Sequence, residues 1–214
     1  TTGPTREYID PVRYISNESS GKQGYEVALA LSNLGIKTTL IAGPSSINFS
    51  KEIKTFNVTS ANDMMIKVKE QLPVDIAVFA AAVSDFSPKI TDKQKIKKNK
   101  VYLDKIDIKK NLDILEFVSK NNKSRPKIVV GFSAETENLL KNSKIKLKNK
   151  HCDLMVANDV SKKETGFNVD YNRVSIIDKN GKVETIMKNK KSYIATILAK
   201  KILDKFLVDD KNIN

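Results

Sequence analysis

Three uninterrupted apolar runs, at residues 75–83, 127–132 and 154–157, constrain the fold of this 214-residue chain more than any other feature. A strand with one face in water alternates apolar and polar residues, whereas a parallel strand covered by helices on both faces is apolar throughout. Amphipathic helical patterns alternate with these runs along the chain. The sequence therefore predicts an α/β fold, with an open, Rossmann-like, mainly parallel sheet and helices on both faces.

The remaining elements continue this alternation. We predict further strands at residues 36–42 and 53–58, and helices at residues 25–34, 62–72, 113–121, 136–150 and 192–206. Thr59 or Ser60 supplies the cap of the second helix. Strands at residues 173–177 and 182–187 flank a turn at residues 178–181, Asp-Lys-Asn-Gly, which predicts a C-terminal hairpin. Residues 1–3 have the character of a strand end, so we expect the chain to begin inside its first strand.

We expect one domain over residues 1–208 and a frayed tail over residues 209–214, since this length suits a single α/β core. Residues 89–110 are rich in lysine, and they are too long and polar for an ordinary connection. We therefore interpret residues 87–110 as a mobile flap.

The net charge of +13 and the pI near 9.6 favour polyanionic partners, such as nucleic acid, an anionic membrane surface or a highly phosphorylated small molecule. Lysine is abundant throughout the chain, so the charge alone is weak evidence for nucleic acid, and no nucleic-acid motif accompanies it. No apolar run reaches the length of a membrane span, and no leader pattern is visible. We expect a cytoplasmic protein that binds neither nucleic acid nor membrane.

The chain has one cysteine, Cys152, and one histidine, His151. A single cysteine excludes an intramolecular disulfide, and a single histidine argues against a His-rich metal site or a Ser-His-Asp triad. We interpret both residues as structural.

Residues 10–24 hold an unusual number of groups suited to anions. Residues 16–21, Ser-Asn-Glu-Ser-Ser-Gly, precede the first predicted helix, whose free backbone N–H groups favour a phosphate or a carboxylate. Arg13 adds a planar guanidinium that can bind either group through two hydrogen bonds. The alternative is structural, because a Ser/Asn cluster before a helix often serves only as its cap.

Polar residues also follow the apolar runs, at the carboxyl ends of strands where open α/β sheets bind their ligands. Ser84-Asp85 follows the first run, residues 133–136 follow the second, and Asn158-Asp159 follows the third. No Gly-x-Gly-x-x-Gly opens a helix, and Gly21-Lys22 lacks the upstream glycine and the Ser/Thr of a Walker loop. These absences argue against an ordinary P-loop ATPase and an ordinary dehydrogenase, although a Rossmann-like dehydrogenase stays an alternative.

Several segments carry a family resemblance in their order along the chain. They begin with Thr2-Gly-Pro-Thr-Arg-Glu7 and Asp10-Pro-Val-Arg-Tyr-Ile-Ser-Asn17, and continue with residues 19–22, 80–85, 95–98, 131–136 and 153–159. Together they resemble phosphopantothenoylcysteine synthetase, the second coenzyme A biosynthesis activity of bacterial bifunctional flavoproteins. The resemblance spans nearly the whole chain.

The resemblance implies a ligation in two steps. The carboxylate of 4′-phosphopantothenate attacks the α-phosphate of CTP, which is bound with Mg²⁺, and the products are an acyl-cytidylate and pyrophosphate. The amine of L-cysteine then attacks the acyl carbon and releases CMP. The family also implies a homodimer with sites near the interface, and fusion to or association with a flavin-dependent decarboxylase. ATP in place of CTP stays open, and the metal ligands are unknown.

Three residues are the expected catalytic groups. The resemblance makes Lys95 the catalytic lysine, which neutralises charge at the α-phosphate, although residues 95–98 alone are typical of a solvated charge run. Asn17 is the candidate for holding the acyl-cytidylate and the oxyanion that forms during attack by the amine. Arg13 is expected to steady a phosphate or the acyl group, in its own subunit or in a neighbouring one.

The nucleotide-binding residues that we expect are Ser19, Ser20, Gly21, Ala81, Asp85, Lys95, Asp113, Ile114, Phe132, Lys146 and Lys150. Lys146 and Lys150 share a helix face because they lie four residues apart. The structural alternatives are a solvated lysine face, a core position for Phe132 and a capping role for Asp85. Leu112 stands where the family has proline. Glu135 and Asp159 have no partner that spacing assigns, and we interpret them as structural.

Overall fold

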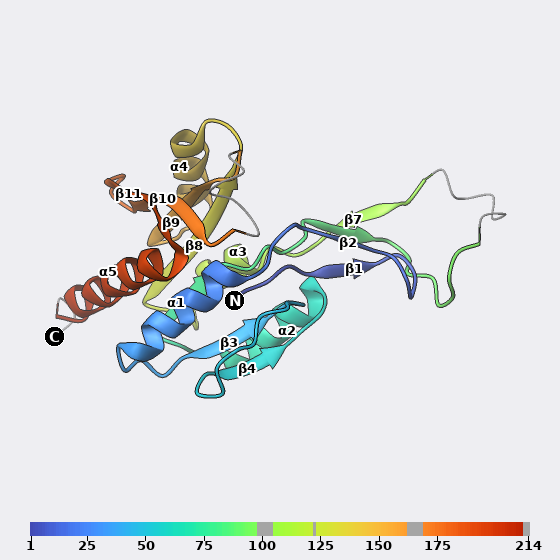
Figure 1. Ribbon diagram of the computed structural model, residues 1–214, viewed down its shortest axis with the longest axis horizontal. Coiled ribbons are helices and arrows are strands. Elements are labelled where there is room, and N and C mark those ends of the chain that lie inside the picture. The colour runs from blue at the N-terminus through green and yellow to red at the C-terminus, as the bar shows by residue number, and fades with distance from the viewer. Residues whose placement is uncertain (98–104, 122, 162–168, 212–214) are drawn as a thin grey trace.

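The predicted sheet is present in the computed structural model, which describes residues 1–97, 105–121, 123–161 and 169–211 (Figure 1). Five strands hydrogen-bond in the order β11 (Val183–Lys190), β10 (Tyr171–Asp178), β9 (Leu154–Asp159), β8 (Ile128–Glu135) and β5 (Ile76–Phe79). β5, β8 and β9 run parallel to one another, and β10 pairs antiparallel with both β9 and β11. The C-terminal hairpin is therefore confirmed as β10 and β11.

A second parallel pair, β3 (Thr39–Ala42) and β4 (Lys54–Asn57), lies beside residues 2–4. The amide of Thr2 donates to the carbonyl of Ile41 at 2.9 Å, and the amide of Ala82 donates to the carbonyl of Gly3 at 2.9 Å. Residues 2–4 therefore connect β3 on one side with the chain that follows β5 on the other. This placement agrees with the strand end predicted at residues 1–3.

Two glycines permit this close packing. A Cβ at Gly43 would lie 1.8 Å from the carbonyl oxygen of Pro4, and one at Gly24 would lie 2.5 Å from the Thr2 hydroxyl. Atoms cannot approach so closely, so larger residues would separate these segments. The first turn of the first helix is consequently packed against the start of the chain.

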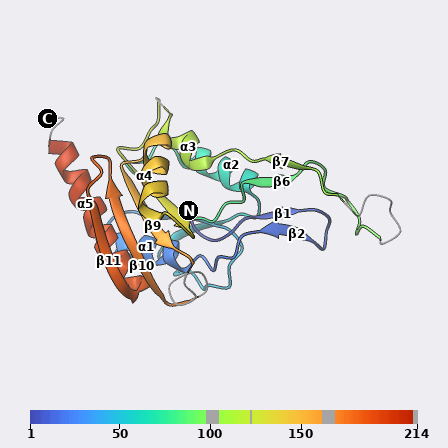
Figure 2. The ribbon, with the colours of Figure 1, turned by 90° about the horizontal axis from the view of Figure 1, so that it is seen from above.

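Helices cover both faces of the sheet, as predicted (Figure 2). On one face lie α1 (Lys22–Asn33) and α5 (Lys191–Lys211), and on the other lie α2 (Ala61–Gln71), α3 (Ile114–Ser119) and α4 (Leu139–Asn149). The continuous apolar run of β8 contributes side chains to the core on both faces of the sheet. Ile128 and Val130 join the core beneath α1 and α5, while Val129 joins the core beneath the other three helices. No helix in the described residues is long and apolar enough to cross a membrane.

Local chemistry sets the helix ends. The predicted cap Ser60 is confirmed: its hydroxyl accepts the Asp63 amide while the Asp63 carboxylate accepts the Ser60 amide. α1 begins at Lys22 and not at residue 25, because Gly21 adopts a left-handed conformation, with φ of 78°, directly before it. α4 begins at Leu139 and not at residue 136. α5 continues through residues 209–211, and residues 212–214 lie outside the described residues, so the frayed tail stays a prediction.

The sequence did not predict an arm that projects from the body (Figure 1). It consists of two antiparallel hairpins, β1 (Arg6–Tyr8) with β2 (Tyr14–Ser16), and β6 (Phe86–Pro88) with β7 (Ile108–Lys110), together with the residues next to them. β1 contacts β6, so the hairpins lie side by side. The flap expected at residues 87–110 therefore begins and ends in the paired strands β6 and β7, which were expected to be mobile. Residues 98–104 lie outside the described residues.

Candidate functional site

The anion loop, residues 16–21, is held against the body by its own polar groups. Thr2 donates its hydroxyl hydrogen to the carbonyl of Gly21 at 2.5 Å, and Ser45 donates to the carbonyl of Ser20 at 2.7 Å. The Ser20 hydroxyl accepts the Lys22 amide at 3.4 Å, and the Ser19 hydroxyl accepts the Gly21 amide at 3.3 Å. Ser19, Ser20 and Gly21 are thus brought to the start of α1, although the residue that caps the helix is glycine and contributes no side chain.

Asn17 joins the anion loop to the chain that follows β5. Its side-chain nitrogen donates to the carbonyls of Ala82 and Val83, each at 3.1 Å. The side chain is otherwise exposed. Both amide hydrogens have acceptors in this arrangement, so donation to an oxyanion requires one of these bonds to break. The catalytic role of Asn17 stays a prediction.

Asp85 is exposed at the end of this segment. It lies beside residues 111–114, the segment in which Leu112 stands where the family has proline. Asn111 donates its backbone amide to the carbonyl of Asp85 at 2.8 Å and its side-chain nitrogen to the carbonyl of Ser84 at 2.9 Å. Ser87 completes the link by donating to the side-chain oxygen of Asn111 at 2.8 Å. Leu112 is 71% exposed, so its side chain is not what holds this connection together.

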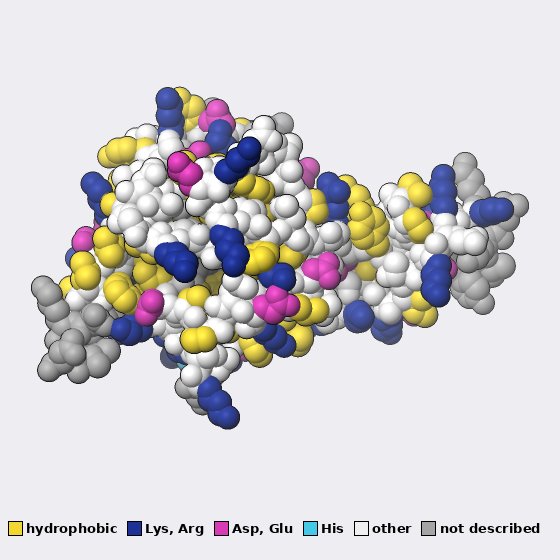
Figure 3. All heavy atoms as spheres, turned by 90° about the horizontal axis from the view of Figure 1, so that it is seen from below, with side chains coloured by type: hydrophobic (Ala, Val, Ile, Leu, Met, Phe, Trp, Pro, Cys, Tyr) yellow, Lys and Arg dark blue, Asp and Glu magenta, His cyan; other side chains and the backbone are white. Residues whose placement is uncertain are grey.

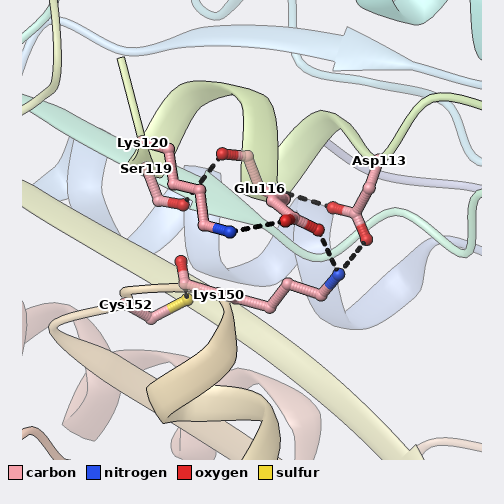
Figure 4. Close-up of polar contacts among 6 residues, drawn as sticks. All are labelled: Asp113, Glu116, Ser119, Lys120, Lys150 and Cys152. Carbon is pink, nitrogen blue, oxygen red and sulfur yellow. Dashed lines mark hydrogen bonds and ion pairs between the residues drawn. The ribbon is translucent and has the colours of Figure 1, made fainter. Parts of the chain in front are cut away.

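Asp113 caps α3 and also belongs to a charged cluster that joins α3 to α4 (Figure 4). The Lys150 ammonium lies 2.7 Å from both the Asp113 and the Glu116 carboxylates, and Lys120 lies 2.6 Å from Glu116. Hydrogen bonds from Lys120 and Lys150 lower the pKa of Glu116 to about 2. Burial lowers the pKa of Lys150, but its bonds to the two carboxylates outweigh this effect and raise it.

Lys146 has a different partner, Glu135 at the end of β8, with 2.7 Å between the charged atoms. The Glu135 carboxylate also accepts hydrogen bonds from Ser133 at 2.5 Å and from Asn142 at 3.3 Å. Burial raises the pKa of Glu135, but the hydrogen bonds from Lys146 and Ser133 outweigh it, so the pKa lies below its ordinary value. The two lysines predicted to share one face therefore contact carboxylates on different elements.

The two large apolar residues of the predicted nucleotide set, Ile114 and Phe132, lie on opposite faces of the sheet. Ile114 is 4% exposed, and its side chain packs in the core beneath α3, so only its backbone is available to a ligand. Phe132 is half-buried and packs against the core beneath α1 and α5. Ala81 is half-buried as well, and its amide donates to the hydroxyl of Thr1 at 3.3 Å. The structure does not bring Phe132 together with Lys146 and Lys150 on one face.

Arg13 and Lys95 lie together on the arm, away from the anion loop. Arg13 forms two hydrogen bonds with the Asp10 carboxylate through Nε and Nη2, and Nη2 also donates to the carbonyl of Ile96 at 3.0 Å. Its guanidinium, predicted to contact a phosphate or an acyl group, thus pairs with a carboxylate of its own chain. Lys95 is exposed, and Lys98 of the same motif lies outside the described residues. Asn17 lies four residues after Arg13 in extended chain, which is about 13 Å along the hairpin.

A groove of about 710 Å³ runs along the anion loop, and Pro4, Arg6, Tyr14 and Ser45 also line it. The Arg6 guanidinium stacks over the Tyr14 ring, 4.7 Å from its centre, which places a cation at the groove. Sequence patterns did not predict Arg6 at this site, nor Glu116 and Glu135 as partners of the predicted lysines. Each of these contacts joins two different elements, so spacing along the chain carried no signal for them. No group of three potential metal-binding side chains occurs among the described residues.

The fold and these contacts define an α/β protein whose polar site lies at the carboxyl ends of parallel strands, which is the usual ligand position in such sheets. Residues 1–206 match the family described as DNA/pantothenate metabolism flavoprotein C-terminal domain. The chain belongs to this family.

Individual relatives agree with this assignment. The chain is 41% identical over 209 residues to the coenzyme A biosynthesis bifunctional protein CoaBC of Haemophilus influenzae. The matched region covers 96% of this chain and 51% of that protein. It therefore spans about half the length of the curated relatives that it matches. A crystal structure of the C-terminal domain of a CoaBC protein is similar, with a TM-score of 0.79, 32% identity, and coverage of 98% of this chain and 93% of that one.

A more distant structure shares the fold alone. It is the mutant H337A of Cab2 in complex with phosphopantothenate-cysteine, with a TM-score of 0.76 and 16% identity, covering 98% of this chain and 87% of that chain.

Proposed function

We propose that this chain joins 4′-phosphopantothenate to L-cysteine in coenzyme A biosynthesis. The observation that carries the proposal is the meeting of three family segments at the carboxyl end of β5. Asn17 of the anion loop bonds to Ala82 and Val83, and Asn111 bonds to Ser84 and Asp85. The name of the bifunctional relatives supports the same chemistry, and the distant neighbour that shares the fold is described in complex with phosphopantothenate-cysteine.

The reaction follows the two steps that the resemblance implies. A carboxylate oxygen of 4′-phosphopantothenate attacks the α-phosphorus of CTP, the bond between the α-phosphorus and the bridging oxygen breaks, and pyrophosphate leaves. The cysteine nitrogen then attacks the acyl carbon, loses its proton, and displaces CMP. Activation is needed because a free carboxylate is a poor acyl donor, whereas a phosphate monoester is a good leaving group.

Mg²⁺ is proposed to arrive with the triphosphate as part of the nucleotide substrate, where it offsets charge on the phosphates. The exposed carboxylate of Asp85 lies in the segment after β5 and is the available protein group for the ribose or for that ion. CTP is preferred over ATP on family resemblance, and ATP is the alternative.

The test is pyrophosphate release from the purified chain with 4′-phosphopantothenate and Mg²⁺, comparing CTP with ATP, each with and without cysteine. We expect release with CTP, and formation of CMP that depends on cysteine. Release with ATP alone would replace the nucleotide and keep the ligation. No release with either nucleotide, from protein whose folding is verified by circular dichroism, would contradict the proposal.

We further propose that the chain acts as a homodimer through its arm. Apolar side chains on the two hairpins and next to them are unusually exposed, and they are Val12, Tyr14, Phe86, Ile90, Ile106 and Ile108. An exposed apolar group of this kind is typical of a protein interface. A dimer also accounts for the separation of Arg13 and Lys95 from Asn17, because an arm can reach the site of a second copy.

The expected association with a flavin-dependent decarboxylase is a proposal that the bifunctional name of the relatives supports. The cytoplasmic location stays a prediction from the sequence.

A further inference from the structure

Asp10 is a fully buried carboxylate on the arm, and the proposed reaction does not use it. Its Oδ1 accepts the backbone amides of Val12 at 2.8 Å and Arg13 at 2.9 Å. Its Oδ2 accepts both Nε and Nη2 of Arg13, and also the amide of Ile96 at 3.2 Å. The last of these bonds reaches 86 residues along the chain, to the residue directly after Lys95.

The segment that carries Lys95 is bonded to the β1–β2 turn at both of its ends. Arg13 Nη2 donates to the carbonyl of Ile96 at 3.0 Å, so both backbone groups of Ile96 are held by the pair of Asp10 and Arg13. At the other end, the amide of Asp92 donates to the carbonyl of Ile9 at 2.9 Å, and the Thr91 hydroxyl donates to the carbonyl of Tyr8 at 3.0 Å.

The charge of Asp10 is compensated locally. The hydrogen bonds from Arg13 are the largest influence and hold the pKa of Asp10 well below its ordinary range, although burial acts in the opposite direction. A buried carboxylate with these donors is a strong, oriented acceptor, and its removal leaves the donors unpaired.

We propose that Asp10 is a positioning residue, which acts through Arg13 and the amide of Ile96 to hold the backbone beside Lys95 in place for the reaction. This inference rests on the proposed function, in which Lys95 neutralises charge at the α-phosphate. A lysine has a long, flexible stem, so the place of its backbone decides which atoms its ammonium reaches. Small displacements of a catalytic group lower rates strongly.

The first experiment measures amide hydrogen exchange at Ile96 in Asp10→Asn and in a matched control, Asp107→Asn. Both variants lose one negative charge on the arm, but Asp107 is exposed and lies before β7. In Asp10→Asn, one acceptor oxygen becomes a donor and opposes Arg13 or Ile96. We expect exchange at Ile96 to accelerate about tenfold or more in this variant, and to stay unchanged in the control. Unchanged exchange in both variants would overturn the proposal.

The second experiment asks whether Asp10 acts through Lys95, using pyrophosphate release. Asp10→Asn is expected to lower kcat about tenfold while KM for CTP stays within about twofold, and Asp107→Asn is expected to match the parent. In a Lys95→Gln background, adding Asp10→Asn should change the remaining rate by less than about twofold. A full additional loss in that background would mean that Asp10 has only a general structural role, and would overturn the proposal.

Failure of Asp10→Asn to fold and failure of the proposed function can each be distinguished from failure of this proposal. If Asp10→Asn does not fold, Arg13→Gln provides the exchange measurement, since Arg13 is 44% exposed and its loss removes the donor to the carbonyl of Ile96. Exchange at Ile96 that stays slow in Arg13→Gln would overturn the proposal. Absence of pyrophosphate release in the parent protein would overturn the proposed function and the role of Lys95. The exchange result would still decide whether Asp10 anchors the segment.

Discussion

Three of the cations predicted to bind a nucleotide or an acyl group are paired with a carboxylate in this structure. Lys146 pairs with Glu135, Lys150 with Asp113 and Glu116, and Arg13 with Asp10. An ammonium or guanidinium group placed by such a pair has a defined position before any ligand arrives. An anionic ligand must compete with the carboxylate for the cation, so binding of a triphosphate is expected to rearrange these pairs.

At the residue scale, Asn17 and Lys95 are predicted to act in different steps. Asn17→Asp is expected to leave pyrophosphate release that depends on CTP largely intact and to slow amide formation, because the oxyanion forms only in the second step. Lys95→Gln is expected to suppress both steps. Quench-flow measurement of pyrophosphate and CMP separates them. Equal loss of both products in Asn17→Asp would contradict this division.

Cys152 is predicted to be an inert thiol. Burial raises its pKa to about 12, with the nearby Asp153 charge adding to the effect, from an ordinary value of 9.0. At pH 8 the thiolate fraction is therefore about a thousandfold below that of an exposed cysteine, and alkylation depends on the thiolate. We expect iodoacetamide to label Cys152 slowly in the native protein and rapidly in urea, as measured by intact mass. Rapid labelling of the native protein would contradict this prediction, because it would mean that the Cys152 thiol is accessible and reactive.

At the scale of elements, side-chain contacts join segments that the backbone leaves separate. The cluster of Asp113, Glu116 and Lys150 connects the start of α3 to the end of α4 (Figure 4). Gly24 and Gly43 act differently, by letting α1 and β3 approach residues 2–4 closely. Both devices hold neighbouring elements in one arrangement.

The contacts of Glu116 predict a pH dependence of stability. Its pKa of about 2 in the folded protein lies below the ordinary value of 4.5, so its contribution is present above about pH 4.5 and is lost as the pH falls toward 2. We expect Glu116→Gln to lower the melting temperature by about 2 °C at pH 7, and the difference from the parent to shrink at pH 3. Glu52→Gln, at an exposed position, is the control. A difference that is independent of pH would contradict the assignment.

At the scale of the whole molecule, the arm changes the shape from an ordinary α/β domain to a body with a projection (Figure 1). Figure 3 shows Lys and Arg side chains scattered over both the body and the arm, with no single basic face in that view. Apolar side chains also lie on the arm, where the body does not cover them. In this view the positive charge is spread over the surface, and the exposed apolar side chains of the arm are the surface proposed for the dimer.

The dimer is tested by a pair of matched substitutions. Ile108 on β7 is 49% exposed and Ile145 on α4 is 50% exposed, so both isoleucines present similar apolar area. We expect the native mass, measured by light scattering, to be that of a dimer for the parent and for Ile145→Glu. Ile108→Glu is expected to shift the mass toward a monomer, because a charge buried in an interface is costly. A monomeric parent protein would contradict the proposal.

The sequence by itself determined the layered α/β fold, because its continuous apolar runs bury strands on both faces and its amphipathic helices must cover them. It also determined the Ser60 cap, a local interaction. Only the tertiary structure decided the arm, whose strands have three residues each and carry too little pattern to be recognised. The same is true of the carboxylate partners of Lys146 and Lys150, and of the bond from Arg13 to the carbonyl of Ile96. These contacts join residues distant in sequence or on separate elements, and only the packed chain brings such groups within hydrogen-bonding distance.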